Sequence, residues 1–293
     1  MKIATFEAED YKKVGVFVEG NLIDIDLLSE VLSHVLNKEF PAILTLVDAI
    51  NEFDSISSMI KKGQSTFKDL FTKLFAVQNP KLASPIDRAN KIICLGKNYV
   101  EHAKETGSKP PTEPIIFGKF ADCVIATNKD IEYPKWAKRI DPEVELAVII
   151  GKTAYDVPIS KAMSYVFGYT ISNDVTEREI QHEDVSKGYP WLRSKNFDTS
   201  MPLGPWIVTK DEIKDPHNLV IELSVNGKVR QKGNTKDMIF KVDYLVSYIS
   251  KYMTLFPGDI ISTGTVAGIA PIQKGDKVVC KLEKIGELVN RVV

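Results

Sequence analysis

DPEVELAVIIG, residues 141 to 151, is the stretch that decides the fold of this chain. From Val144 to Ile150 it is dense in β-branched and aliphatic residues and it stops at Gly151, a pattern that predicts a strand. Because side chains two apart on a strand point to the same face, Glu143 and Glu145 place two carboxylates side by side at the beginning of an apolar strand. Like charges in that position resist ionisation unless a positive charge lies between them. The sequence must therefore supply or bind a cation beside this strand.

The composition is that of an ordinary soluble protein of one or two domains, with 293 residues, 44% of them hydrophobic and 26% charged. The 38 Lys and Arg residues and the 39 Asp and Glu residues give a formal net charge of −1, which offers no electrostatic argument for binding nucleic acid or an anionic membrane. No apolar run approaches the roughly 20 residues of a membrane span, and the N-terminus lacks the apolar segment of a secretory signal. Cys94, Cys123 and Cys280 lie far apart, which predicts buried thiols in a reducing compartment and no disulfide or zinc framework. We therefore expect a cytoplasmic protein with neither nucleic acid nor membrane as a partner.

The N-terminal quarter has a pattern of its own. Residues 1 to about 26 alternate like the strands of a small hairpin or meander, and the stretch from Leu27 to Phe75 has the apolar spacing of helices. Residues 78–90 are polar and contain two prolines, which is typical of a boundary. We therefore expect a small N-terminal α+β domain over residues 1–77 and a linker over 78–90.

The remainder of the chain, residues 91–293, consists mostly of short apolar runs separated by turn signals. The Asn226-Gly227 pair suits a type I′ turn and is the strongest hairpin signal in the sequence. Only two long helical patterns interrupt the runs, near 158–166 and 239–253. The pattern predicts a β-rich second domain in an α+β protein, folded as a sandwich or barrel.

Asp174 ends another apolar run, VFGYTISND, as a residue does when it projects from a sheet edge into a cleft. With Glu143 and Glu145 it supplies three carboxylates on strands of one sheet system. Ligand sets made only of oxygen favour a hard divalent cation, Mg²⁺ first, with Mn²⁺ or Ca²⁺ as alternatives. The competing interpretation is that the two glutamates lie on a solvated strand face and that Asp174 caps a turn.

The segment CLGKNYVEHAKETG, residues 94–107, predicts a short helix with Asn98 as its N-cap and Gly107 as its stop. On that helix His102 and Glu105 are three residues apart and share a face. A carboxylate beside an imidazole orients it and raises its basicity, which is how a water molecule is activated. An ordinary pair on an exposed helix is the alternative.

Two further stretches contain candidate residues. Lys195 lies among aromatic residues in GYPWLRSKNF, where its charge can meet a substrate carboxylate. Gly264 and Thr265 lie in a Gly-rich loop whose backbone N–H groups and hydroxyl can bind an anion. The alternatives are that Lys195 faces solvent and that Gly264 and Thr265 form an ordinary tight turn.

Taken in order, these stretches resemble the fumarylacetoacetate hydrolase superfamily over about two-thirds of the chain, from about Ile92 to the C-terminus. The resemblance rests on six motifs: GKNYVEHAKE, DPEVELAVIIGK, GYTISNDVTEREIQ, GYPWLRSKNFDTSMPLGPWI, VNGKVRQKGNT and PGDIISTGT. It implies a rolled mixed β-sheet, a homodimer and, as in some members, an additional N-terminal domain. The chain departs from the family pattern where Lys97 replaces an arginine and where Phe120 and Val266 replace prolines.

The resemblance also implies roles for individual residues. Metal ligands would be Glu143, Glu145 and Asp174; catalytic residues would be His102 and Glu105 on a lid, together with Lys195. Substrate-binding residues would be Lys97, Tyr99, Lys119, Arg178, Gln181, Gly264 and Thr265.

The implied activity is that of a divalent-metal-dependent enzyme acting on 2-oxo or 2,4-dioxo acids. Its partner would be a small oxo acid, which suggests aromatic compound catabolism. We expect hydrolysis of a C–C bond in an acylpyruvate or fumarylpyruvate type of substrate through a metal-stabilised enolate. In that mechanism His102 activates water, and Lys195 balances the developing negative charge. A decarboxylase, an isomerase and a sugar-acid dehydratase would use the same site, and a non-catalytic Ca²⁺-binding module is the alternative from another class.

Overall fold

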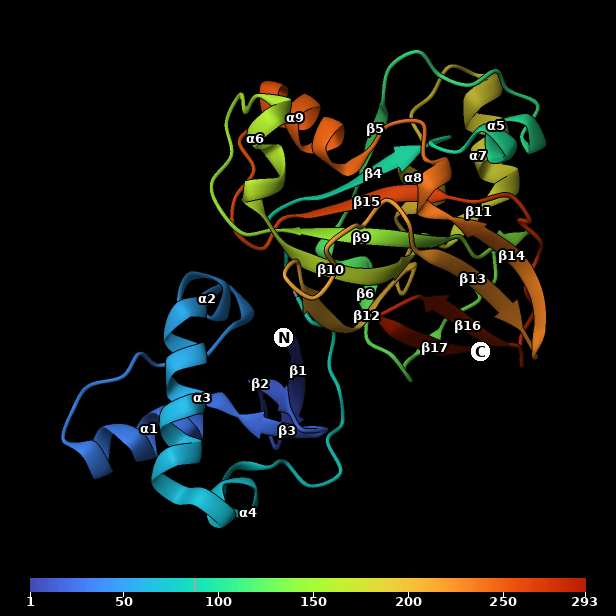
Figure 1. Ribbon diagram of the computed structural model, residues 1–293. Coiled ribbons are helices and arrows are strands. Elements are labelled where there is room, and N and C mark those ends of the chain that lie inside the picture. The colour runs from blue at the N-terminus through green and yellow to red at the C-terminus, as the bar shows by residue number, and fades with distance from the viewer. Residues whose placement is uncertain (87) are drawn as a thin grey trace.

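The computed structural model describes residues 1–86 and 88–293 and is built around one large β-sheet (Figure 1). That sheet has ten strands, in the order β3 (Asn21–Asp24), β2 (Tyr11–Val18), β1 (Lys2–Ala8), β12 (Met201–Thr209), β10 (Val166–Asn173), β9 (Val144–Ile150), β15 (Ile260–Thr265), β4 (Ile92–Gly96) and β5 (Ile115–Lys119), with β6 (Val124–Ile125) paired to β12. A second sheet has five strands, in the order β14 (Lys228–Asn234), β13 (Val220–Val225), β16 (Lys277–Leu282), β17 (Gly286–Val292) and β7 (Asp130–Ile131). A short ribbon pairs β11 (Thr176–Glu177) with β8 (Ile140–Asp141).

The large sheet is mixed, because β15 runs parallel to β4 and antiparallel to β9. The predicted β-rich α+β class is therefore confirmed. The hairpin at Asn226-Gly227 is confirmed as well, since both residues have positive φ, 51° and 78°, as a type I′ turn requires.

Strand β9 lies between β10 and β15, and all seven of its residues are buried. Burial on both faces explains why its sequence, apart from Glu145, is apolar throughout and does not alternate. The antiparallel register with β10 places Asn173 beside Val144 and Ser172 beside Glu145. The end of β10 therefore meets the beginning of β9, which is where the three candidate carboxylates are found.

The helices fall into two groups (Figure 1). The N-terminal group accompanies β1 to β3 and comprises α1 (Ile25–Leu36), α2 (Leu46–Asn51), α3 (Phe53–Phe67) and α4 (Phe71–Phe75). The second group comprises α5 (Val100–Glu105), α6 (Ile159–Ala162), α7 (Arg178–Ser186), α8 (Leu192–Lys195) and α9 (Val242–Tyr252). Short 3₁₀ turns are η1 (Lys68–Leu70), η2 (Ala121–Cys123), η3 (Met163–Tyr165) and η4 (Thr235–Asp237). No helix in the described ranges is both long and apolar enough to cross a membrane.

Three helices, α6, α7 and the four-residue α8, differ from the sequence prediction. The pattern near 158–166 yields only the four residues of α6 followed by a 3₁₀ turn, while the pattern near 239–253 becomes α9. Helix α7 was not predicted, because its buried positions are the polar residues Arg178, Gln181 and Asp184. A search for apolar periodicity misses a helix whose buried face is polar.

The N-terminal segment continues the large sheet. Strand β1 pairs antiparallel with β12, so that Lys2 lies beside Val208 and Ile3 beside Ile207. One hydrophobic cluster contains Ile3 together with Phe167 and other core residues of the C-terminal part. The division at residues 78–90 remains a prediction, and both hydrogen bonds and core packing extend across it.

Candidate active site

Three carboxylates meet where β9 begins and β10 ends. Glu143 precedes β9, Glu145 lies within it, and Asp174 follows β10. The backbone N–H of Asp174 donates to the carbonyl of Glu143 at 2.9 Å, which ties the two strand ends together. One oxygen of each carboxylate lies within 4.8 Å of the other two, and all three residues are buried. A compact set of three oxygen donors fits a hard divalent cation.

The carboxylates differ in their electrostatic surroundings. Burial opposes the ionisation of Glu143, but the positive charges of Lys195 and Arg178 outweigh it and hold its pKa well below the usual range. Glu145 contacts no cationic side chain in the described residues; its Oε2 accepts hydrogen bonds from Ser262 Oγ at 2.6 Å and from the Gly264 N–H at 2.9 Å. Burial and the neighbouring charge of Asp174 raise the pKa of Glu145 to about 8. The protein's own cations therefore compensate Glu143 but not Glu145.

Lys195 is the central cation of the site. Its ammonium group donates to Glu143 at 2.8 Å, Asp174 at 2.6 Å and Thr176 at 2.6 Å. Burial alone would lower the pKa of Lys195, but the charges of Asp174 and Glu143 raise it, so the group stays protonated. Lys119 donates to the other oxygen of Asp174 at 2.9 Å.

His102 and Glu105 form a hydrogen-bonded pair on α5. The Nδ1 atom of His102 lies 3.3 Å from Glu105 Oε2, and Glu105 Oε1 accepts the backbone N–H of Gly268 at 3.0 Å. Burial opposes ionisation of Glu105, but the bonds from His102 and Gly268 outweigh it and lower its pKa. The carboxylate therefore orients the imidazole and also ties α5 to the loop after β15.

The predicted N-cap of this helix was wrong, while the predicted stop was right. The N-cap is Tyr99, which makes no side-chain capping bond. The amide of Asn98 instead accepts from the N–H of Phe240 at 2.8 Å and donates to the carbonyls of Phe240 at 3.0 Å and Thr263 at 2.7 Å. Gly107, with φ of 69°, follows the last helical turn. Asn98 thus fixes the base of α5 to segments that are distant in sequence.

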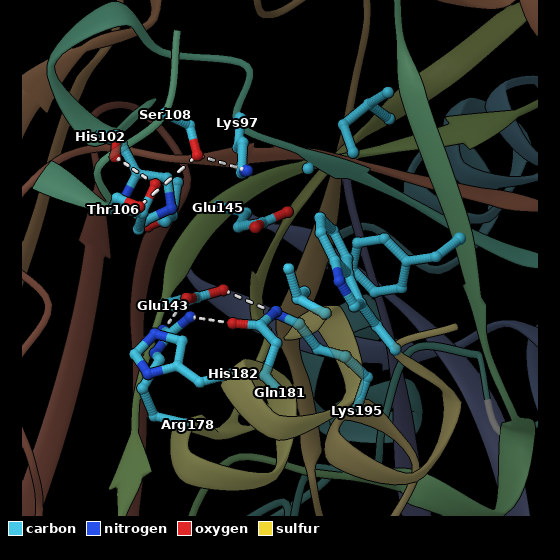
Figure 2. Close-up of a pocket in the computed structure, with 16 residues that line it drawn as sticks. Lys97, His102, Thr106, Ser108, Glu143, Glu145, Arg178, Gln181, His182 and Lys195 are labelled. Carbon is cyan, nitrogen blue, oxygen red and sulfur yellow. Dashed lines mark hydrogen bonds and ion pairs between the residues drawn. The ribbon is translucent and has the colours of Figure 1, made fainter. Parts of the chain in front are cut away.

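A cavity of about 100 Å³ joins these groups (Figure 2). The predicted site residues that line it are Lys97, His102, Glu143, Glu145, Arg178, Gln181, Lys195 and Thr265. In Figure 2 side chains of α7 enter from one side and Lys97 and Ser108 from the other, with Glu143 and Glu145 between them.

The other predicted residues do not line the cavity; they are Tyr99, Glu105, Lys119, Asp174 and Gly264. Glu105 supports His102, Lys119 supports Asp174, and Gly264 donates its N–H to Glu145. Tyr99 is buried, and its hydroxyl has no hydrogen-bond partner in the described residues.

Sequence reasoning did not single out several lining residues, among them His182 and Trp191. His182 directly follows Gln181 on α7, so a sequence prediction of that helix would have indicated His182 as a candidate site residue. The ring of Trp191 packs over Gly96, where an added Cβ would lie only 2.5 Å from it. Glycine at position 96 is therefore required for this wall of the cavity, a relation visible only once the strands are placed.

Comparison with known proteins places the chain in a family. The family model described as fumarylacetoacetate (FAA) hydrolase C-terminal matches residues 91–293. The chain belongs to this family. The family resemblance expected from the motifs is thereby confirmed, and the neighbouring structures confirm the fold.

Full-length similarity extends beyond that domain. This chain is 42% identical over 304 residues to oxaloacetate tautomerase Fahd2a, mitochondrial, of Rattus norvegicus. The match covers 100% of this chain and 92% of that protein. The fumarylpyruvate hydrolase structure from Pseudomonas aeruginosa, in complex with Mn²⁺ and pyruvate, is 34% identical with a TM-score of 0.68, covering 70% of this chain and 90% of that one. The 5-carboxymethyl-2-hydroxymuconate delta-isomerase structure from Mycobacterium smegmatis is 32% identical with a TM-score of 0.75, covering 100% and 98%. These relatives are enzymes named for a tautomerase, a hydrolase and an isomerase reaction.

Proposed function

We propose that this family member is a divalent-cation-dependent enzyme that forms the enolate of a small 2-oxo acid. One observation carries the proposal: His102 lines the same cavity as Glu143 and Glu145. Glu105 is hydrogen-bonded to His102, and Asp174 completes the buried carboxylate cluster. Glu143, Glu145 and Asp174 would hold the cation, Mg²⁺ first and Mn²⁺ or Ca²⁺ as alternatives. The bound cation would act as a Lewis acid that stabilises negative charge on the substrate's keto oxygen.

The chain's own residues would move the protons. Because Nδ1 of His102 is engaged with Glu105, its Nε2 is the nitrogen left to accept a proton. For a 2,4-dioxo acid of the acylpyruvate or fumarylpyruvate type, His102 would take a proton from a water that attacks the distal carbonyl. The ammonium group of Lys195 would balance the charge left on the departing enolate. C–C bond hydrolysis is our first candidate reaction.

A second candidate is keto–enol tautomerisation of a 2-oxo diacid such as oxaloacetate. It is supported by the similarity to the rat tautomerase, which is 42% identical and spans the whole chain including the N-terminal segment. Here His102 would exchange a proton with the carbon next to the keto group, and no water would be consumed.

We further propose a homodimer formed through residues 91–293, and a cytoplasmic location. Two-fold symmetry is the commonest oligomeric arrangement, and a partner subunit covers exposed sheet edges. The three cysteines are free and buried, as suits a reducing compartment.

The test measures both reactions in the same preparations. Purified protein is assayed on an acylpyruvate and on oxaloacetate, with Mg²⁺ and after exhaustive chelation. Chelation should abolish both activities, and Glu143→Gln should lower both because it weakens the cation site. Undiminished turnover in chelated protein would contradict the proposal.

The His102→Ala variant tests the proton-transfer role. It should bind the cation with nearly unchanged affinity, while the preferred reaction falls by roughly 10²–10⁴-fold, the range for loss of a general base. The control is His34→Ala, an exposed histidine on α1. Full turnover by His102→Ala with saturating cation would show that the His102–Glu105 pair has no role in proton transfer.

A further inference from the structure

In each of the three carboxylates, one oxygen accepts hydrogen bonds from groups that do not bond to the other two carboxylates. Arg178 donates to Glu143 Oε1, and Lys119 donates to Asp174 Oδ1 at 2.9 Å. The corresponding partners of Glu145 are uncharged, because Oε2 accepts from the Ser262 hydroxyl and the Gly264 N–H. Its Oε1 accepts no hydrogen bond from the described residues, which leaves that oxygen to the cavity that Glu145 lines.

Behind Glu145 lies a chain of two serine hydroxyls. Ser262 Oγ is 2.6 Å from Glu145 Oε2, and Ser172 Oγ is 2.6 Å from Ser262 Oγ. Both serines are fully buried. Because a hydroxyl has one proton, Ser262 can donate to Glu145 only if Ser172 donates to Ser262. The three residues come from adjacent strands β10, β15 and β9, so the sheet itself holds the chain in place.

The backbone of β15 adds a second donor to the same oxygen. The register between β15 and β9 shifts between Ser262 and Thr265, and Gly264 within that shift has φ of 93°. This left-handed conformation favours glycine, and here it accompanies an N–H directed at Glu145. Two donors on one oxygen restrict rotation of the carboxylate.

We propose that Ser262, supported by Ser172, is a positioning residue that fixes Glu145 and presents its Oε1 to the cation. The inference rests on the cation site of the proposed function. Partners that hold metal ligands typically account for 10–100-fold of metal affinity.

Ser262 is the informative position because its replacement by alanine removes a hydroxyl and no charge. Replacing Arg178 or Lys119 would change the net charge of the site along with ligand orientation, so weaker cation binding in those variants would have two explanations. The matched control is Ser250→Ala on α9: Ser250 is also fully buried, and its hydroxyl accepts from the Val157 N–H and donates to the Ser247 carbonyl, both at 3.0 Å.

The experiment titrates Mn²⁺ alone into the full-length protein and follows free Mn²⁺ by electron paramagnetic resonance, with the unfolding temperature of each cation-free protein measured in parallel. We expect Ser262→Ala to weaken Mn²⁺ binding by roughly 10–100-fold, Ser172→Ala to weaken it less, and Ser250→Ala to leave it unchanged. We also expect the spectrum of bound Mn²⁺ to change in Ser262→Ala, because one ligand becomes less ordered.

The outcomes separate the two proposals. Wild-type affinity in Ser262→Ala overturns the positioning role and leaves the cation site standing. Equal losses in Ser262→Ala and Ser250→Ala also overturn it, since a general loss of packing would then explain both. If Ser262→Ala does not fold, wild-type affinity in Ser172→Ala overturns the support assigned to that hydroxyl. Absence of Mn²⁺ binding by the wild-type protein overturns the cation site, and with it the proposed function.

Discussion

Cation affinity should depend steeply on pH because of Glu145. Its pKa of about 8 means that this carboxyl is mostly protonated at neutral pH when no cation is bound. A cation needs the carboxylate, so binding must release the proton. With one group of that pKa, about 1% is ionised at pH 6, about 10% at pH 7 and half at pH 8. The apparent affinity should therefore be about 50-fold lower at pH 6 than at pH 8.

The same shift has a consequence for stability, and its sign is opposite to that of an ordinary ion-paired acid. The folded pKa is raised from 4.5 to about 8, so between these values the folded protein holds a proton that the unfolded chain has released. The contribution of Glu145 to stability is fully present below pH 4.5 and is lost as the pH rises through 8. Stabilisation by a saturating cation should accordingly grow over the same interval.

Isothermal titration calorimetry with Mg²⁺ or Mn²⁺ at pH 6, 7 and 8 measures the predicted pH dependence of cation affinity. Repeating the pH 7 titration in two buffers of different ionisation enthalpy should show release of about 0.9 proton per cation. His102→Ala is the control, because it removes the histidine that lines the same cavity and should leave the pH dependence of cation binding in place. Equal apparent affinity at pH 6 and pH 8, with no proton released, would refute the reasoning.

Three further predictions concern stability. Arg178→Met removes one of the two cations that contact Asp141 and one of the two that contact Glu143, and it leaves Arg139 and Lys195 in place. It should lower the free energy of unfolding in urea by roughly 1–3 kcal/mol, and a loss below about 0.5 kcal/mol would contradict the ion-pair argument. Gly264→Ala should lower stability by about 1–3 kcal/mol in the same assay, since φ is 93° and the added Cβ would lie 2.8 Å from that of Asn98; a wild-type midpoint would show that the loop adapts without strain. The fragment 91–293 should unfold at lower urea than the full chain, because it loses the strand that pairs with β12; an unchanged midpoint would mean that the N-terminal segment is an independent unit.

Much of the site could be predicted because its signals are local. The spacing of Glu143 and Glu145, the apolar run that ends before Asp174 and the three-residue separation of His102 and Glu105 each depend on the geometry of a single strand or helix. The six motifs then identified the family. The Asn98 cap failed because a side-chain amide that is free on an isolated helix found partners in Phe240 and Thr263.

The order and period of side chains by themselves determined the strands of the core, the hairpin at Asn226 and the need for a positive charge beside Glu143. Only the tertiary structure decided where that charge comes from, because the pairing of distant segments depends on packing and not on local spacing. Folding brings Lys195 between Glu143 and Asp174, whereas the donors that reach Glu145 from the described part of the chain are a hydroxyl and a backbone N–H. Two glutamates that look alike in sequence therefore differ in charge state, since burial penalises the ionised form wherever no cation is within reach.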